Sequence, residues 1–179
     1  MLLALLATPA LAEDRPLVSP SRDVDVVYVM AGPEAPLAQR LRWGVALGKL
    51  RVDPPSPGMF VIIDTASHVM QTVREGDRSV LEMPAGGVLP GAAPDAGFTR
   101  AGEAAFAGLS CTQWRTRDAA GREVLVCLTA DGVLLRAEAD GLVLLQAARV
   151  SFAPQPEQVF RVPPDYRKII SPPASAQRR

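Results

Sequence analysis

Two Asp-Gly dipeptides interrupt the apolar stretch Glu123-Val-Leu-Val-Cys-Leu-Thr-Ala-Asp-Gly-Val-Leu-Leu-Arg-Ala-Glu-Ala-Asp-Gly-Leu-Val-Leu-Leu145. An Asp-Gly pair between apolar runs is the strongest short-range signal of a β-hairpin, because glycine accepts the positive φ angle that such turns require. The stretch therefore predicts three consecutive antiparallel strands, over residues 123–129, 133–139 and 142–152. A strand over residues 105–117 is expected to precede them, joined by a turn at residues 118–121.

The same alternation of short apolar runs and turn residues extends back to Val18. Residues 24, 26, 28 and 30 are apolar and fall on one face of a strand over residues 23–30. Residues 59–63 are apolar throughout, which is typical of a strand buried on both faces. Further strands are predicted over residues 69–73, 78–83 and 98–103.

Residues 36–52 fit two structures. An amphipathic helix would carry Leu37, Leu41 and Val45 on one side. Two strands joined at Gly48 would instead direct alternate apolar residues to one face. We favour the two strands, because Trp43, Gly44 and Val45 are together a poor choice for a helix.

The predicted elements sum to roughly nine to eleven short antiparallel strands, each with a mostly apolar face. We therefore expect a mainly β fold, with one domain over residues 18–166 built on a curved antiparallel sheet. Such a sheet must cover its apolar face by closing, by curling or by holding something in its concavity. Residues 84–97 are rich in Gly, Pro and Ala and should form a loop, either a resting loop or a lid. Residues 167–179 are expected to form a disordered tail.

Residues 1–12, Met1-Leu-Leu-Ala-Leu-Leu-Ala-Thr-Pro-Ala-Leu-Ala12, form a short apolar run that ends in small residues. This is the pattern of a secretory signal peptide with an A-x-A cleavage site, so we expect export to the periplasm. Lys plus Arg and Asp plus Glu each number 19, so no charge excess favours binding to nucleic acid. No later run is long enough for a transmembrane helix, which predicts a soluble protein rather than an integral membrane protein.

Cys111 and Cys127 fall on the two arms of the hairpin whose turn is residues 118–121. Counting back from the turn places them on the same rung or within two residues of it. Because antiparallel neighbours approach as closely as a disulfide requires, and because an exported protein meets an oxidising compartment, we predict that they are bonded.

No pattern of residues points to catalysis. His68 is the only histidine, it lies in a predicted turn, and no nucleophile elbow accompanies it. No glycine-rich phosphate loop and no metal-ligand spacing occurs, so neither a cofactor nor a metal is expected. Arg40, Arg42, Lys49 and Arg51 form either an anion or lipid-headgroup site or, more simply, a solvated charged face.

Six stretches carry a resemblance to a known group. They are Leu41-Arg-Trp43, Leu50-Arg-Val-Asp53, Ile62-Ile-Asp64, Gly108-Leu-Ser-Cys-Thr-Gln-Trp114, Cys127-Leu-Thr-Ala-Asp-Gly-Val-Leu-Leu-Arg136 and Phe160-Arg-Val-Pro-Pro-Asp-Tyr166. In these residues the chain resembles small periplasmic DUF4412-like proteins of uncharacterised function, within the broader LolA/LolB-like group. The resemblance covers residues 24–166. It implies a half-open antiparallel sheet around an apolar concavity, which in the best-understood relatives holds acyl chains of lipoproteins. It implies no catalytic residues.

Two hypotheses follow. The first is a non-enzymatic periplasmic protein that shelters an apolar ligand, such as an acyl chain or a lipoprotein segment, in a concave sheet. Its expected lining residues are Trp43, Phe60, Ile62, Val80, Phe106 and Leu135. The second is a structural or interaction module of the cell envelope with a filled core, which binds a protein along a sheet edge or the Pro-rich tail. An apolar cavity of roughly 300 Å³ or more would favour the first.

Overall fold

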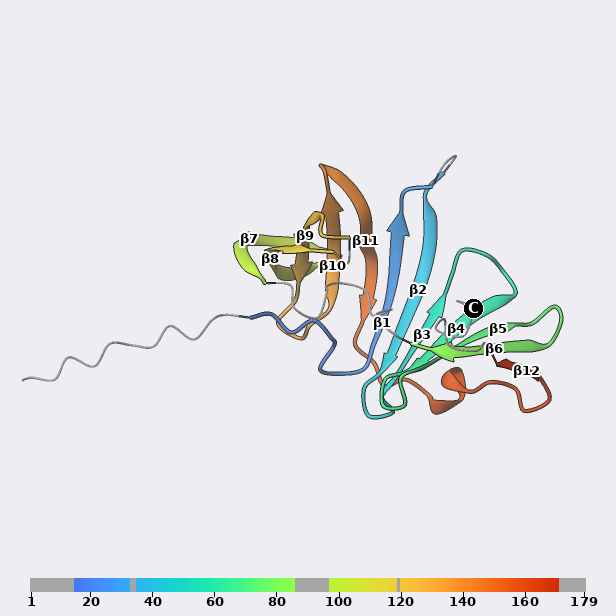
Figure 1. Cartoon of the computed structure of the whole chain (residues 1–179). Helices are drawn as coiled ribbons and strands as arrows, with labels where there is room; N and C mark the ends of the chain where they lie inside the picture. The colour runs from blue at the N-terminus through green and yellow to red at the C-terminus, as the bar shows by residue number, and fades with distance from the viewer. Residues whose placement is uncertain (1–14, 33–34, 86–96, 119, 171–179) are drawn as a thin grey trace, which may run out of the picture.

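The computed structural model describes residues 15–32, 35–85, 97–118 and 120–170, and its strands form a single sheet (Figure 1). The sheet has 12 strands in the order β12-β6-β5-β4-β3-β2-β1-β11-β10-β9-β8-β7. The elements are β1 (Val24–Met30), β2 (Leu37–Gly44), β3 (Lys49–Asp53), β4 (Met59–Asp64), β5 (Val69–Arg74), β6 (Ser79–Pro84), β7 (Thr99–Phe106), β8 (Leu109–Arg117), β9 (Glu123–Leu128), β10 (Leu134–Ala139), β11 (Leu142–Ser151), the 3-10 helix η1 (Glu157–Phe160) and β12 (Arg167–Ile170). The predicted mainly β, antiparallel fold class is confirmed, with 12 strands instead of nine to eleven.

The turn chemistry places most of the hairpins as expected. Gly132 and Gly141 have φ angles of 79° and 75°, so both Asp-Gly pairs supply the left-handed residue that their turns need. Residues 36–52 form the two strands β2 and β3, in which Leu41 pairs with Val52.

One hairpin lies elsewhere than predicted. The boundary expected near residue 104 is instead at Ala107 and Gly108, whose φ angles are 51° and 75°, and β7 continues to Phe106. Alanine seldom adopts a positive φ angle, so an Ala-Gly pair gives a weak turn signal.

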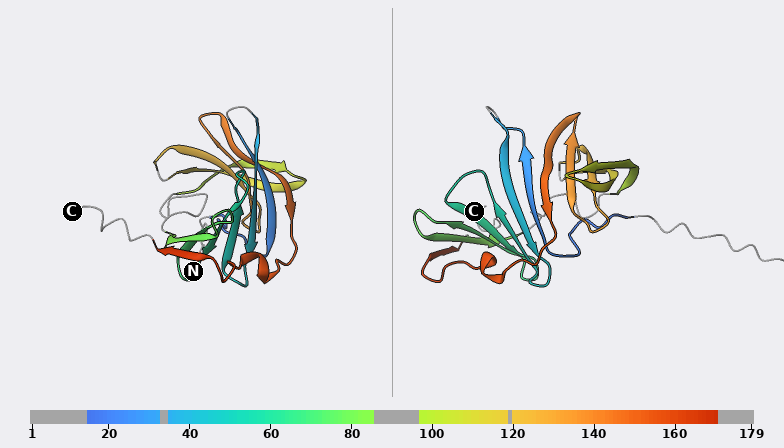
Figure 2. Two further views of the ribbon diagram at one scale, coloured as in Figure 1. Left: turned by 90° about the vertical axis from the view of Figure 1, so that its right-hand side faces the viewer. Right: turned by 180° about the vertical axis from the view of Figure 1, so that it is seen from behind.

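The sheet is curved into a half-barrel. Seen from the side, its two ends bend to the same side of β1, β2 and β11 (Figure 2). The inner side carries Val24, Val26 and Tyr28, and the Tyr28 hydroxyl donates to the Leu134 carbonyl of β10 across the intervening β11, over 2.7 Å. We call this side the concave face and the other side, which carries Asp25 and Val27, the convex face.

The C-terminal part of the chain covers the convex face of β4 to β6. Phe60, Ile62, Val73 and Val80 form a buried cluster there, and Val162 and Tyr166 pack against it. Beyond them, β12 pairs in parallel with β6, with Lys168 opposite Val80. Residues 167–170 are therefore a strand, which corrects the prediction that the disordered tail begins at residue 167.

The remaining predictions for the termini and the long loop concern residues outside the described ranges. These are the signal peptide at residues 1–12, the central part of the 84–97 loop and the tail at residues 171–179. In the described part of the chain, no helix has the length and apolar character needed to cross a bilayer.

Cys111 and Cys127 form the predicted disulfide, with Cα atoms 5.4 Å apart. The residue opposite Cys127 in the β8–β9 ladder is Gln113, two positions from Cys111. The bond therefore joins diagonal neighbours of one hairpin.

Candidate functional site: the concave face

Two rows of mostly apolar side chains cross the concave face from β2 to β6. The register of the ladders aligns them, because residues directly opposite each other in an antiparallel pair point to the same face. Their inner neighbours on β1 are Val24 and Val26, which are opposite Trp43 and Leu41. The first row is Trp43, Leu50, Ile63, Met70 and Met83, and the second is Leu41, Val52, Val61, Thr72 and Leu81. We call these the concave rows.

The concave rows remain partly open at the outer strands. Val52, Val61, Met70, Leu81 and Met83 are half-buried, whereas on the convex side of the same strands Val73 and Val80 are 0% exposed. The difference arises because the C-terminal segment packs on one face of β4 to β6 and not on the other. The concave rows are therefore an apolar surface that a ligand could cover further.

A small inner pocket lies where the concave rows meet β1 and β10. It has a volume of about 70 Å³, and its lining includes Tyr28, Leu41, Trp43, Val133 and Leu134. Burial raises the pKa of the Tyr28 phenol above its ordinary value, so the hydroxyl stays protonated and donates to Leu134. The inner pocket is nearly filled by the protein itself.

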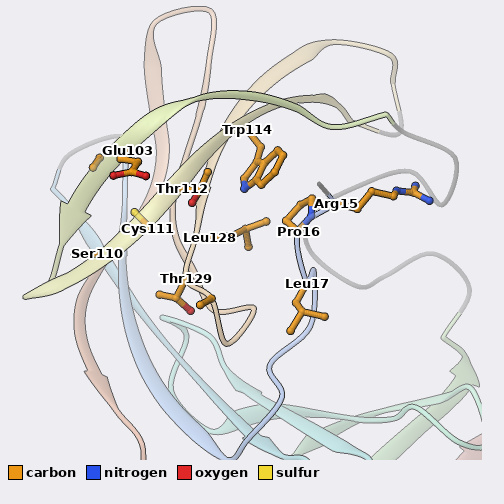
Figure 3. A pocket seen from close by; sticks show the side chains of 12 residues that line it. Arg15, Pro16, Leu17, Glu103, Ser110, Cys111, Thr112, Trp114, Leu128 and Thr129 are labelled. Atoms are coloured by element: carbon orange, nitrogen blue, oxygen red, sulfur yellow. The ribbon is translucent and has the colours of Figure 1, made fainter. Parts of the chain in front are cut away.

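A larger rim pocket lies against β8 and β9, with a volume of about 630 Å³ (Figure 3). Its walls include Thr112, Trp114, Leu128 and Thr129, together with the N-terminal segment at residues 15–17. The volume exceeds the roughly 300 Å³ that favours a ligand site. The lining is mixed rather than purely apolar, which differs from the cavity that the sequence led us to expect.

The N-terminal segment separates the two pockets. Leu17 lines the rim pocket, and Val18 lines the inner pocket. The segment is fixed to the β9–β10 turn, where the Ser21 amide donates to the Asp131 carbonyl over 2.9 Å and Arg22 pairs with the Asp131 carboxylate at 2.8 Å. A Cβ atom at Gly132 would come within 2.2 Å of the Ser19 carbonyl oxygen, so this glycine also permits the close approach.

The arginine cluster predicted as an anion site or a charged face lies on the convex face. Arg42 and Arg51 both bind the Asp53 carboxylate, at 2.6 and 2.7 Å. Arg40 pairs with Asp25. Burial raises the pKa of Asp53, but hydrogen bonds from Arg51 and Arg42 outweigh it and hold that pKa below the ordinary value. These arginines are bound by carboxylates, which favours the charged-face interpretation.

Arg51 also fastens the C-terminal segment. Its guanidinium donates to the Val159 carbonyl over 2.9 Å and lies 3.7 Å from the centre of the Phe60 ring. Lys49, the fourth cation of the predicted group, faces Asp64 across the β3–β4 ladder. The cluster therefore has a structural part in holding the convex cover.

The structure distributes the six predicted lining residues over both faces. Trp43 lines the inner pocket. Leu135 is 0% exposed within the adjoining core, and the Phe106 side chain packs against that core beneath Arg136. Phe60, Ile62 and Val80 are buried under the C-terminal segment on the convex face, so they lie on the opposite face of the sheet from the concave rows. Because β4 is apolar on both faces, its sequence does not reveal which face is which.

Sequence reasoning missed Val52, Val61, Met70, Leu81 and Met83. They could have been identified from the register of the strand pairs. The turns after β3, β4 and β5 set this register, which determines the residues that align with Trp43 and Leu41 on the concave face.

The structure also locates the residues weighed for catalysis. His68 is exposed in the turn after β4, and in that turn Asp64 accepts the backbone amides of Ala66 and Ser67, at 3.1 and 2.9 Å. The Ser67 amide is the main reason that the pKa of Asp64 lies below its ordinary value. Among the described residues, no group of three or more His, Cys, Asp or Glu side chains could hold a metal ion.

Comparison with known proteins identifies the fold. No protein-family model and no curated protein matches the chain. An uncharacterised conserved protein from Thermus thermophilus matches with a TM-score of 0.63 at 17% identity, covering 84% of this chain and 91% of that one. MucB matches with a TM-score of 0.57 at 12% identity, covering 84% of this chain and 60% of that one. The complex of MucA and MucB from Pseudomonas aeruginosa matches with a TM-score of 0.48 at 11% identity, covering 84% and 59%.

These likenesses concern the fold alone, since all are below 20% identity. The chain spans about three fifths of the length of MucB. The curved, mainly β half-barrel that we expected is confirmed.

Proposed function

We propose that this chain is an exported, non-catalytic binding protein of the periplasm that shelters an apolar ligand on the concave face of its sheet. The ligand class is an acyl chain, carried by a lipid or by a lipoprotein segment. The single observation that carries the proposal is the contrast between the two faces of β4 to β6. On the convex one, the C-terminal segment packs on the buried side chains of Phe60, Ile62, Val73 and Val80. On the concave one, Ile63 is buried, but Val61, Met70, Leu81 and Met83 are half-buried among the described residues.

The energetics of this surface suit an acyl chain. Burying a methylene group contributes about 0.8 kcal/mol, so covering half the surface of a fourteen-carbon chain contributes about 6 kcal/mol. That gain corresponds to a dissociation constant of tens of micromolar, before contacts in either pocket are added. The methionines at positions 70 and 83 favour such a ligand, because their flexible side chains adapt to chains of different shape.

The proposed location and the proposed lack of catalysis rest on separate features. The apolar leader at residues 1–12 and the Cys111–Cys127 disulfide both support an oxidising compartment outside the cytoplasm. The exposed position of His68 supports binding rather than hydrolysis. The resemblance to DUF4412-like and LolA/LolB-like proteins, which we retain as part of the proposal, points the same way.

A matched pair of variants tests the proposal with cis-parinaric acid, a fatty acid whose fluorescence rises in apolar surroundings. Val61 lies in the concave rows, and Val27 is a half-buried valine on the convex face, opposite Arg40. We expect saturable binding to the wild type and to Val27→Glu, and at least tenfold weaker binding to Val61→Glu, because a buried carboxylate in the ligand surface loses its hydration. Equal binding to both variants, or none to the wild type, would overturn the proposal.

One observation favours a second function, the binding of a protein partner. Strand β7 ends the sheet, contains no proline and carries mostly exposed side chains, so a partner strand could extend the sheet there. MucB, which shares this fold, forms a complex with MucA. This function can be tested with a photo-crosslinking amino acid in place of Ala105 on β7. Binding of a partner protein predicts one defined crosslinked product in the periplasm, in the same amount with and without Val61→Glu.

A further inference from the structure

The rim pocket contains an unsatisfied hydrogen-bond donor. Trp114 is 5% exposed, and its indole nitrogen has no hydrogen-bond partner among the described residues. In Figure 3 this nitrogen is on the side of the ring that faces Thr112 and Leu128, which also line the pocket. Buried donors are nearly always paired in folded proteins, because an unpaired one loses its bond to water without replacement.

A second unsatisfied group lies on the same face of β8. Thr116 is 4% exposed, and its hydroxyl also has no partner among the described residues. Because successive side chains of a strand alternate between faces, Thr112, Trp114 and Thr116 point to one side. In the rim pocket, the Thr129 hydroxyl accepts the Val133 amide at 3.0 Å and keeps its own hydrogen to donate. Of these residues, Thr112, Trp114 and Thr129 line the rim pocket and give its wall neutral donors, whereas Thr116 is not part of the lining.

The charges near the pocket are at its exposed edge. Glu103 is bound by Arg100 at 2.6 Å, and Arg15 belongs to the N-terminal segment at the mouth. The deeper wall consists of Trp114, Leu128 and the threonines, which are uncharged. An uncharged acceptor on an apolar body matches this wall better than a carboxylate or a phosphate, because a full charge would be costly to bury without a cation.

We propose that the rim pocket recognises the ester carbonyl of an uncharged acyl-ester lipid, with the Trp114 indole N–H as its donor. The inference rests on the proposed function, since the acyl chain of that lipid would lie along the concave face. Trp114 and Trp43, the two tryptophans of the chain, then serve different parts of one ligand. Trp114 binds the carbonyl, and the acyl chain passes over the N-terminal segment, which separates the two pockets at Leu17 and Val18, to reach Trp43 beside the inner pocket.

The test compares two amphiphiles that differ only in this carbonyl, 1-monomyristoylglycerol and the matched ether 1-O-tetradecylglycerol. Each is titrated against bound cis-parinaric acid in the full chain. A single hydrogen bond corresponds to about three- to tenfold in affinity, so the wild type should prefer the ester by that factor. Trp114→Phe should bind the ether as the wild type does and lose the preference for the ester.

Trp43→Phe is the matched control, because it makes the same substitution at the other tryptophan. It should weaken both amphiphiles alike and keep the preference, and the urea midpoints of both variants establish that they fold. The inference would be overturned if Trp114→Phe keeps the preference for the ester over the ether, or if the wild type lacks that preference. In either case, binding of parinaric acid to the wild type would still support the proposed function. If parinaric acid does not bind the wild type, both fail.

Discussion

At the scale of single residues, Gly132 shows how one position can serve two requirements. Its φ angle of 79° suits the β9–β10 turn, and the sequence predicted this from the Asp-Gly pair. Its contact with the Ser19 carbonyl could not be predicted, because nothing in the local pattern indicates that a distant segment crosses the turn.

Gly132→Ala should therefore destabilise the protein more than Gly141→Ala. Gly141 has a similar φ angle of 75°, but a Cβ atom there would meet nothing within 4 Å. We expect a loss of about 1–2 kcal/mol in the free energy of unfolding for Gly141→Ala from backbone strain, and about 2–4 kcal/mol for Gly132→Ala because steric overlap adds to the strain. Urea denaturation measures both, and equal losses would show that the N-terminal segment is not held at this turn.

Asp53 is the residue on which the convex arginine cluster depends. Asp53→Asn should lower the free energy of unfolding by about 1–3 kcal/mol at neutral pH, because Arg42 and Arg51 lose a shared carboxylate. The sequence identified the arginines but not this partner, since the pairing follows from the ladder register.

The effect of Asp53→Asn on the free energy of unfolding should depend on pH. The pKa of Asp53 is lower in the folded protein than its ordinary value of about 4, so its contribution is complete above that value and decreases as the pH falls through the folded-state pKa. The stability difference between the wild type and Asp53→Asn should accordingly be constant from pH 7 to about 5 and shrink below about 4. A difference that grows on acidification would contradict the assigned pairing.

At the scale of elements, hairpins were predictable and faces were not. The Asp-Gly turns and the break at Gly48 located β2, β3, β9, β10 and β11, because turn chemistry is local. The face of β4 could not be assigned, since the run Met59 to Ile63 is apolar on both sides. Which side the C-terminal segment covers depends on contacts made about a hundred residues later in the chain.

The β8–β9 hairpin is the element that the disulfide stabilises. Cys111 and Cys127 are 16 positions apart, and a closed loop of this size contributes about 3 kcal/mol by restricting the unfolded chain. We expect Cys111→Ser to fold and to melt about 6–12 °C below the wild type under non-reducing conditions. An unchanged melting temperature would count against the bond as a source of stability.

At the scale of the whole molecule, the half-barrel is asymmetric in how its two faces are covered. The sheet has apolar side chains on both faces of β4 to β6, and within the described residues the C-terminal segment packs on the convex face. The curvature draws β1, β10 and the N-terminal segment around the inner pocket. Farther out on the concave face, Val61, Met70, Leu81 and Met83 are half-buried. The sequence predicted a curved sheet with an apolar concavity, but only the three-dimensional register separates lining residues from core.

Native mass spectrometry of the protein isolated from the periplasm without detergent, for the wild type and for Val61→Glu, tests whether the concave face holds an apolar ligand. We expect a wild-type species that carries an adduct of lipid mass, on a chain 2 Da lighter than its reduced form because the disulfide is closed. For Val61→Glu we expect the same chain without the adduct. A bare wild-type mass, or an adduct that Val61→Glu retains in full, would contradict the claim that the concave face holds an apolar ligand.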